Sequence, residues 1–115
     1  MPTTAALIRQ NIASGDVMVV RHAAAQLKRR AIRLEDVIAG AAASEVIEDY
    51  PHDDAGPAVL MLQRDAGGSP LHVIWRIEAA TAGPALLITA YRPDAAQWSA
   101  DFRTRNSGLS GGPIS

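Results

Sequence analysis

The chain has 115 residues, which is the size of one domain with a buried core. Its 11 basic and 12 acidic side chains give a net charge of −1, so the chain as a whole is not expected to be drawn to nucleic acid or to a membrane surface. The absence of cysteine excludes disulfide scaffolds, thiolate zinc sites and cysteine nucleophiles.

The first part of the chain predicts three helices. Apolar residues recur at helical spacing in three segments, 3–13, 22–30 and 34–43. Thr3 or Thr4 can cap the first of these helices, and Gly15 can end it. Glu35 and Asp36 stand at the start of the third helix, where the helix dipole favours carboxylates.

Residues 16–20 are expected to form a short extended run, and from Glu45 onward the apolar pattern changes to alternation. Alternation between turn residues predicts four strands, at 45–50, 58–64, 71–79 and 85–92. Helices first and antiparallel strands after them are typical of an α+β fold, here a four-stranded antiparallel sheet with helices on one face. We expect one domain over residues 1–105. Residues 106–115 are too poor in apolar side chains to order themselves and are predicted to be a flexible tail.

No segment of the sequence looks like a targeting or membrane segment. The apolar run at the N-terminus contains Arg9, Gln10 and Asn11, which the core of a signal peptide would not. No stretch approaches the ~20 apolar residues that cross a bilayer. We therefore expect a cytoplasmic chain with no membrane partner.

Alternation along the third predicted strand divides its side chains between two faces. Leu71, Val73, Trp75 and Ile77 are expected to face the helices, and His72 and Arg76 the other side. Neighbouring strands can add further side chains to the His72 face, namely Glu48, Tyr50, Met61, Gln63, Thr89 and Tyr91, most of them polar. Such a face could hold a phosphodiester and move a proton. The alternative is the ordinary polar face of an antiparallel sheet, which has no function and is the commoner case.

The second predicted helix is basic along one side. His22, Gln26, Arg29 and Arg30 are spaced so that they can project together, with other cations beside them. An imidazole among guanidinium groups could contact successive phosphates and act as a general acid or base. The alternative is a solvated helix whose arginines pair with the five carboxylates of segment 45–54.

Other kinds of site have little support in the sequence. His52, Asp53 and Asp54 are adjacent in a turn, and adjacent residues rarely converge on one metal ion, so no metal site is predicted. There is no nucleophile elbow and no glycine-rich phosphate loop after a strand, so no cofactor is predicted either. Trp75 and Trp98 are expected to anchor the core rather than stack on bases.

An ordered series of short motifs gives the chain a family resemblance. Between residues 20 and 105 these motifs are RHAAAQLKRRAI, EDV, VIEDYPHD, SPLHVIW, ITAYRPDAAQW and DFRTR. In this order they resemble the bacterial family called domain of unknown function 4258. The positions that the family usually keeps include Tyr50, His72, Tyr91, Pro93 and Trp98. Gln26 stands where members usually carry a basic residue, and Ala31 where they carry glycine.

The resemblance implies a distant relation to the RelE and barnase group of small ribonucleases, which agrees with the predicted order of helices and strands. It implies a toxin-type or toxin-derived ribonuclease that needs no metal, with RNA as substrate and an antitoxin protein as a further partner. Its residues would be His22 and His72 as base and acid, Tyr91 as a positioning hydroxyl, and substrate-binding Arg29, Arg30, Arg76 and Tyr50. The alternative is a non-catalytic interaction module of the same fold.

Overall fold

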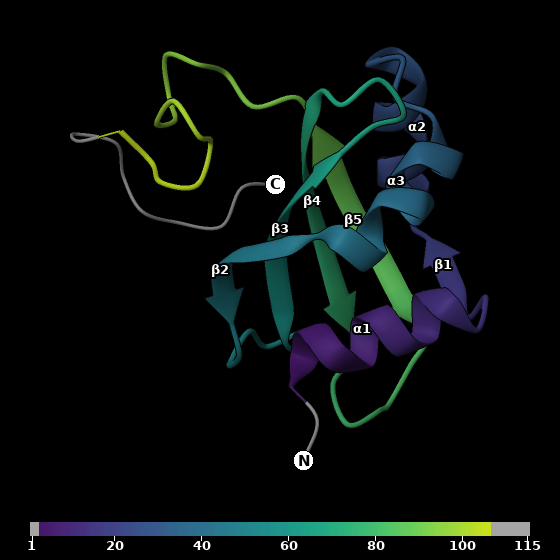
Figure 1. Cartoon of the computed structure of the whole chain (residues 1–115). Coiled ribbons are helices and arrows are strands. Elements are labelled where there is room, and N and C mark those ends of the chain that lie inside the picture. The colour runs from purple at the N-terminus through teal and green to yellow at the C-terminus, as the bar shows by residue number, and fades with distance from the viewer. Residues whose placement is uncertain (1–2, 107–115) are drawn as a thin grey trace.

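The computed structural model of the chain describes residues 3–106, and these form helices and one sheet (Figure 1). In chain order the elements are α1 (Thr4–Ala13), β1 (Val17–Val19), α2 (Arg21–Arg29), α3 (Leu34–Gly40), the 3₁₀ helix η1 (Ala41–Ala43), β2 (Glu45–Tyr50), β3 (Ala58–Arg64), β4 (Pro70–Ile77) and β5 (Ala85–Tyr91). The three predicted helices and the four predicted strands are confirmed. Their ends agree within two residues, except that the third helix ends at Gly40 and the chain continues to Ala43 as η1. The tail predicted after Arg105 lies almost wholly outside the described residues.

Local sequence explains where α1 begins and ends. The Thr3 hydroxyl accepts a hydrogen bond from the Ala6 amide at 3.1 Å and so caps the first turn. The helix buries Ile8 and Ile12, which are spaced four apart and therefore lie on one side. Gly15, in the left-handed region at φ +81°, turns the chain out of the helix toward β1.

The sheet has five strands in the order β1-β5-β4-β3-β2 and is mixed, because β1 runs parallel to β5 while the other neighbours are antiparallel. The four predicted strands pair antiparallel as expected, but the prediction of a purely antiparallel, four-stranded sheet is wrong because β1 adds a fifth, parallel strand. Residues 17–19 were expected to be extended, but three residues carry no alternation. Nothing local indicates that their hydrogen-bonding partner lies almost seventy residues further along the chain.

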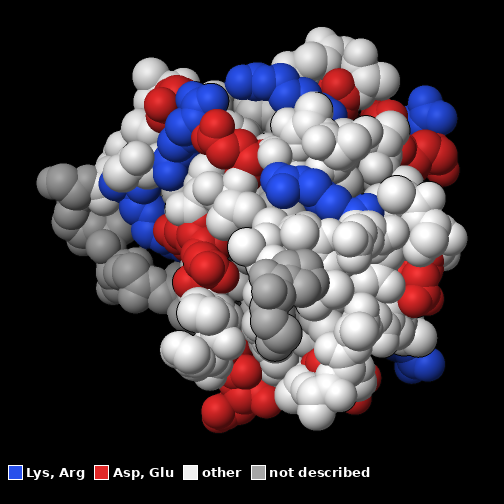
Figure 2. All heavy atoms as spheres, turned by 60° about the horizontal axis from the view of Figure 1, so that its bottom comes forward, with Lys and Arg blue, Asp and Glu red and all other residues white. Residues whose placement is uncertain are grey.

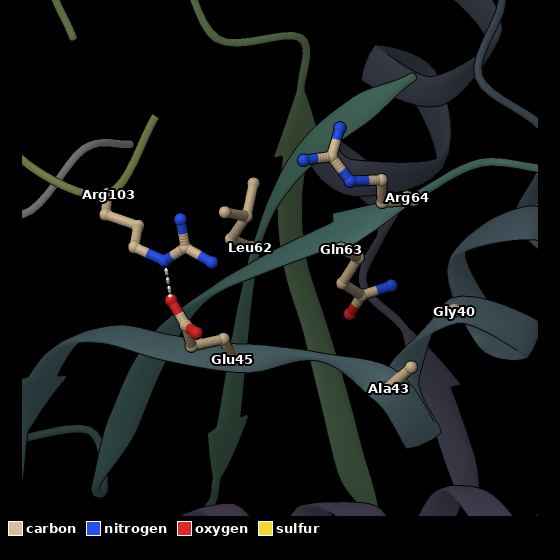
Figure 3. A pocket seen from close by; sticks show the side chains of 7 residues that line it. All are labelled: Gly40, Ala43, Glu45, Leu62, Gln63, Arg64 and Arg103. Atoms are coloured by element: carbon tan, nitrogen blue, oxygen red, sulfur yellow. Dashed lines mark hydrogen bonds and ion pairs between the residues drawn. The ribbon is translucent and has the colours of Figure 1, made fainter. Parts of the chain in front are cut away.

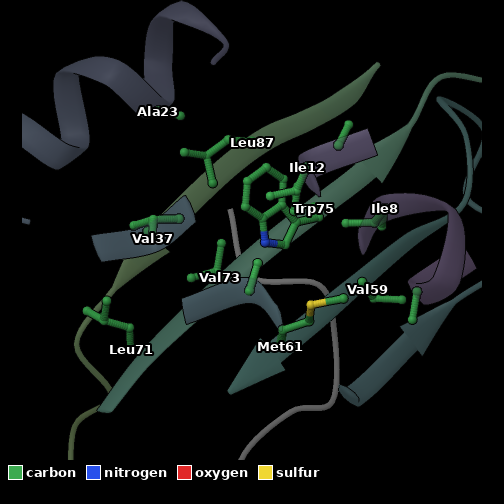
Figure 4. Close-up of a cluster of buried hydrophobic side chains, with 14 of the residues drawn as sticks. Ile8, Ile12, Ala23, Val37, Val59, Met61, Leu71, Val73, Trp75 and Leu87 are labelled. Atoms are coloured by element: carbon green, nitrogen blue, oxygen red, sulfur yellow. The ribbon is translucent and has the colours of Figure 1, made fainter. Parts of the chain in front are cut away.

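The larger core lies between the helices and one face of the sheet (Figure 4). Leu71, Val73, Trp75 and Ile77 are buried there, as alternation predicts. Gln63 lies on this face too, where its amide donates to the Val37 carbonyl at 2.8 Å and accepts from the Trp75 indole at 3.2 Å.

The placement of Met61 and Gln63 beside His72 is therefore wrong. In the register of β3 with β4, Leu62 is opposite His72 and Met61 is opposite Val73. Residues 58–62 are all apolar, so alternation gives no sign of which of them face the helices.

The second face of the sheet is covered as well. Residues 94–106, which we call the C-terminal strap, lie on the side opposite α2 and α3 (Figure 1). Trp98 of the strap joins a smaller apolar cluster with Ala58, Leu60 and Ile74. This face, expected to meet solvent, is thus partly closed by the chain's own C-terminal residues.

Candidate functional site

His72 lies at the centre of the second face and is fully buried. Its Nε2 is 2.8 Å from the Phe102 carbonyl oxygen, and its Nδ1 is 3.1 Å from the Tyr91 hydroxyl. A carbonyl can only accept, so Nε2 carries the proton and Nδ1 of the neutral ring accepts from Tyr91. Burial lowers the pKa of His72 below its ordinary value, although the Phe102 carbonyl opposes this shift. The ring is therefore neutral at pH 7.

Tyr91 is the half-buried neighbour of His72 on β5. Burial raises its pKa above the ordinary value, and the positive charges of Arg105 and Arg30 only partly offset this. The hydroxyl therefore stays protonated and donates a hydrogen bond to His72 Nδ1. The end of α2 meets the end of β5 here, because Arg30 donates a hydrogen bond to the carbonyl of Ala90, the residue before Tyr91.

A second polar group lies beside His72 and links β2 to the strap. The Arg105 guanidinium makes two hydrogen bonds to the Glu48 carboxylate, at 2.7 and 3.0 Å, and Tyr50 donates a short hydrogen bond to the same carboxylate. Burial by itself would raise the pKa of Glu48, but the bonds from Arg105 and Tyr50 outweigh it and the net shift is downward. Burial and the Glu48 charge raise the pKa of Tyr50 to about 12.

The strap closes this site from outside. The Trp98 ring meets the His72 ring edge-on, with centroids 4.3 Å apart, and the Arg105 guanidinium lies 4.8 Å above the Trp98 ring. Arg103 forms an ion pair with Glu45 on β2, at the rim of a small cavity (Figure 3). That cavity, of about 170 Å³, is lined by Gly40, Ala43, Glu45, Leu62, Gln63, Arg64 and Arg103. Two arginines of the strap are thus fixed to two glutamates of β2.

The residues predicted to form the basic side of α2 have different surroundings and partners. Gln26 is buried, and its carbonyl oxygen accepts from the Thr89 hydroxyl while its nitrogen lies 2.7 Å from Nε2 of the exposed His22. Arg30 donates to the Ala90 carbonyl at 2.8 Å, directly beside Tyr91. Arg29 is exposed. Of the predicted basic side, Arg30 is the residue that the structure places at the Tyr91 site.

Arg76 lies apart from His72 on β4. It pairs with Asp53 at 3.1 Å and donates to the Gly56 carbonyl at 3.3 Å. The four-residue separation along the strand corresponds to roughly 13 Å. One phosphate therefore cannot contact the two side chains together in this arrangement.

The acidic segment 45–54 has partners other than those predicted from sequence. Its ion pairs to Arg103, Arg105 and Arg76 take the place of the expected pairs with α2. On the face shown in Figure 2, basic and acidic side chains alternate rather than gather into one basic patch. Binding of a polyanion by that face through general attraction is therefore not indicated.

Sequence reasoning found four of the residues that converge here, namely Arg30, Tyr50, His72 and Tyr91. It missed Glu48 and Arg105 as a pair. Glu48 was visible as a polar residue on the face of Tyr50, and Arg105 ends the motif DFRTR. Their pairing joins positions 57 apart, which neither periodicity nor spacing can reveal.

The fold and the site define a small α+β domain whose polar sheet face is covered by a C-terminal segment. The model of the family described as domain of unknown function (DUF4258) matches residues 19–92, and the chain belongs to this family. Searches of curated proteins and of solved structures gave no match. The family match includes Arg30, His72 and Tyr91. It ends before the strap, whereas the motif resemblance extends to Arg105. No helix within residues 3–106 has the length and apolar character to cross a membrane.

Proposed function

We propose that the chain is a RelE-like, toxin-type or toxin-derived ribonuclease that acts on RNA without a metal. The observation that carries the proposal is the hydrogen bond of the Tyr91 hydroxyl to the neutral His72, together with the bond of the Arg30 guanidinium to the carbonyl of Ala90, the residue before Tyr91. All three residues lie inside the family match. A hydroxyl backed by a proton acceptor and flanked by a guanidinium is an arrangement suited to phosphodiester chemistry.

In the proposed reaction the ribose 2′-hydroxyl attacks the adjacent phosphorus, and the bond from phosphorus to the 5′-oxygen breaks. The 2′-hydroxyl proton passes to the Tyr91 oxygen as the Tyr91 proton moves to His72 Nδ1, and solvent protonates the leaving 5′-oxygen. Arg30 offsets the charge that develops on the phosphate. A guanidinium has five N–H donors, so the bond to Ala90 leaves Arg30 able to bind an anion.

This proposal assigns the expected residues different roles. Because His72 is buried and both its ring nitrogens have partners, it acts through Tyr91 and is a positioning residue. His22 and Arg30 are eight residues apart on α2, about 12 Å along the helix axis. In the proposal His22 therefore contacts a neighbouring nucleotide rather than the phosphate that reacts.

The test uses the full chain, a labelled single-stranded RNA and a buffer with EDTA. Cleavage that leaves 2′,3′-cyclic phosphate ends is expected, and Tyr91→Phe should slow it by roughly a hundredfold, as loss of a proton-transfer group does. Arg30→Gln should slow it as well. Its control is Arg33→Gln, which removes one charge from an exposed position of the same surface segment and should leave the rate within about twofold.

Two results would overturn the proposal. One is intact RNA with both the wild-type chain and Trp98→Ala, in which the strap is loosened. The other is cleavage that Tyr91→Phe leaves unchanged.

The second candidate is a non-catalytic interaction module of the same fold, with a protein such as an antitoxin as its partner. The burial of His72 under Trp98 favours it, because a buried imidazole cannot exchange a proton directly with a substrate. It predicts intact RNA throughout, together with a stable complex with the product of an adjacent reading frame that survives Tyr91→Phe.

A further inference from the structure

We infer that the C-terminal strap is an autoinhibitory cover that holds the His72–Tyr91 site closed. The identity of the inhibited reaction rests on the proposed function, whereas the covering itself rests on contacts within residues 3–106. The strap begins two residues after the family match ends, at residue 94.

The strap is folded on itself rather than paired into the sheet. The backbone hydrogen bonds found for it in the described part of the chain join strap residues to one another, as from the Ser99 amide to the Thr104 carbonyl at 2.8 Å. Trp98 and Arg105 form an isolated bridge between its two ends. Removing the strap from the sheet therefore breaks no rung of the β ladder, and the domain beneath keeps its backbone pairing.

Trp98 and Phe102 pack the strap onto the apolar cluster of the second face, and a few polar side-chain contacts hold it over the proposed site. His72 Nε2 donates to the Phe102 carbonyl, Arg105 binds Glu48, and Arg103 binds Glu45. The Arg103 and Glu45 side chains are about half exposed, so this pair is readily screened. The strap thus accepts a hydrogen bond from the imidazole whose other nitrogen binds the Tyr91 hydroxyl. Its attachment depends partly on an ion pair that is weak because it is exposed.

The backbone at the point of contact is strained. Phe102 has φ +60°, a left-handed conformation that residues with a side chain seldom adopt outside turns. Its carbonyl is the one that accepts from His72. Hydrogen bonds within the strap hold this conformation, including the one from the Phe102 amide to the Ser99 carbonyl at 2.8 Å, so the strap's own fold presents the carbonyl to His72.

The test measures the rate at which diethyl pyrocarbonate modifies each of the three histidines in the full chain. His22 and His52 are exposed and serve as internal standards, whereas His72 is buried under the strap. In the wild-type chain His72 should react at least tenfold more slowly than the other two. In Arg103→Gln/Arg105→Gln it should react within about threefold of them, and the rate of RNA cleavage should rise at least tenfold.

Two further variants complete the design. Trp98→Ala loosens the strap without changing its charge and should act in the same direction. Arg33→Gln breaks an exposed ion pair away from the strap and should change neither rate. Unchanged circular dichroism shows that a variant remains folded, and unchanged modification of His22 and His52 shows that the reagent was equally active in each sample.

The outcomes separate the two proposals. If His72 stays as slow as in the wild-type chain in both folded strap variants, the inference is overturned. If His72 becomes reactive but cleavage does not rise above a measurable wild-type rate, autoinhibition is overturned and the ribonuclease stands. If His72 becomes reactive and RNA stays intact throughout, the ribonuclease proposal and the inhibition that rests on it are overturned.

Discussion

The Glu48–Arg105 pair offers a quantitative test of how firmly the strap is docked. The perturbation is a double-mutant cycle made of Glu48→Gln, Arg105→Gln and the combined variant. The two side chains are 23% and 17% exposed and share two hydrogen bonds, so water screens them much less than it screens a surface pair. Two unit charges 4 Å apart attract by about 4 kcal/mol at an effective dielectric constant near 20. Desolvation removes a large part of this gain, which leaves an expected coupling of about 1–2 kcal/mol.

The assay is urea unfolding of the four chains at pH 7, with the coupling taken from the free energies of unfolding. The matched control is the same cycle for Arg33 and Glu35, whose side chains are each 71% exposed. An exposed pair of this kind should show a coupling below about 0.5 kcal/mol. A Glu48–Arg105 coupling no larger than that of the control would show that the strap is not held against β2 as described.

Further predictions concern the pH dependence of stability and two positions in the fold. Because folding holds the pKa of His72 below its ordinary 6.5, the unfolded chain binds more protons below that pH, and the free energy of unfolding should fall as the pH is lowered from about 6.5. His72→Phe should remove this part of the pH profile, and a profile identical to that of the wild-type chain would contradict the assignment. Gln63→Leu leaves two buried hydrogen-bonding groups without their partner and should destabilise the chain by about 2–4 kcal/mol in urea unfolding, whereas a loss under 1 kcal/mol would show that neither bond matters. Gly56→Ala would bring a Cβ within 2.0 Å of the Ile77 carbonyl oxygen and should lower the melting temperature by several degrees more than Gly68→Ala, a left-handed turn position with open space around it; equal shifts would contradict the close approach of Gly56 to the end of β4.

The sequence predicted those parts of the fold that have a local signal. Helical spacing found α1, α2 and α3, and alternation along β4 placed Val73 and Trp75 in the core. The pairing of β1 had no such signal, because a three-residue strand has no measurable period. The facing of β3 was equally hidden, since its residues are apolar on both faces and both faces are covered.

The site could be predicted in part for the same reason. His72 and Tyr91 lie in alternating strands, so the face that they share follows from the pattern. The burial of that face does not follow, because the strap has little regular structure and its contacts with Glu45 and Glu48 join distant parts of the chain. The sequence therefore indicated an exposed polar surface where the structure has an enclosed one.

The most direct measurement is photochemical cross-linking of RNA to the surface formed by the ends of α2 and β5. A single-stranded oligonucleotide that carries 4-thiouridine would be cross-linked to full-length Arg103→Gln/Arg105→Gln, and the attached peptides identified by mass spectrometry. Cross-links in the peptides that contain Arg30 and Tyr91, weakened by Arg30→Gln, are the result expected if RNA binds at this site. Cross-links confined to α1 or β1, or their absence from a folded variant with a reactive His72, would contradict it.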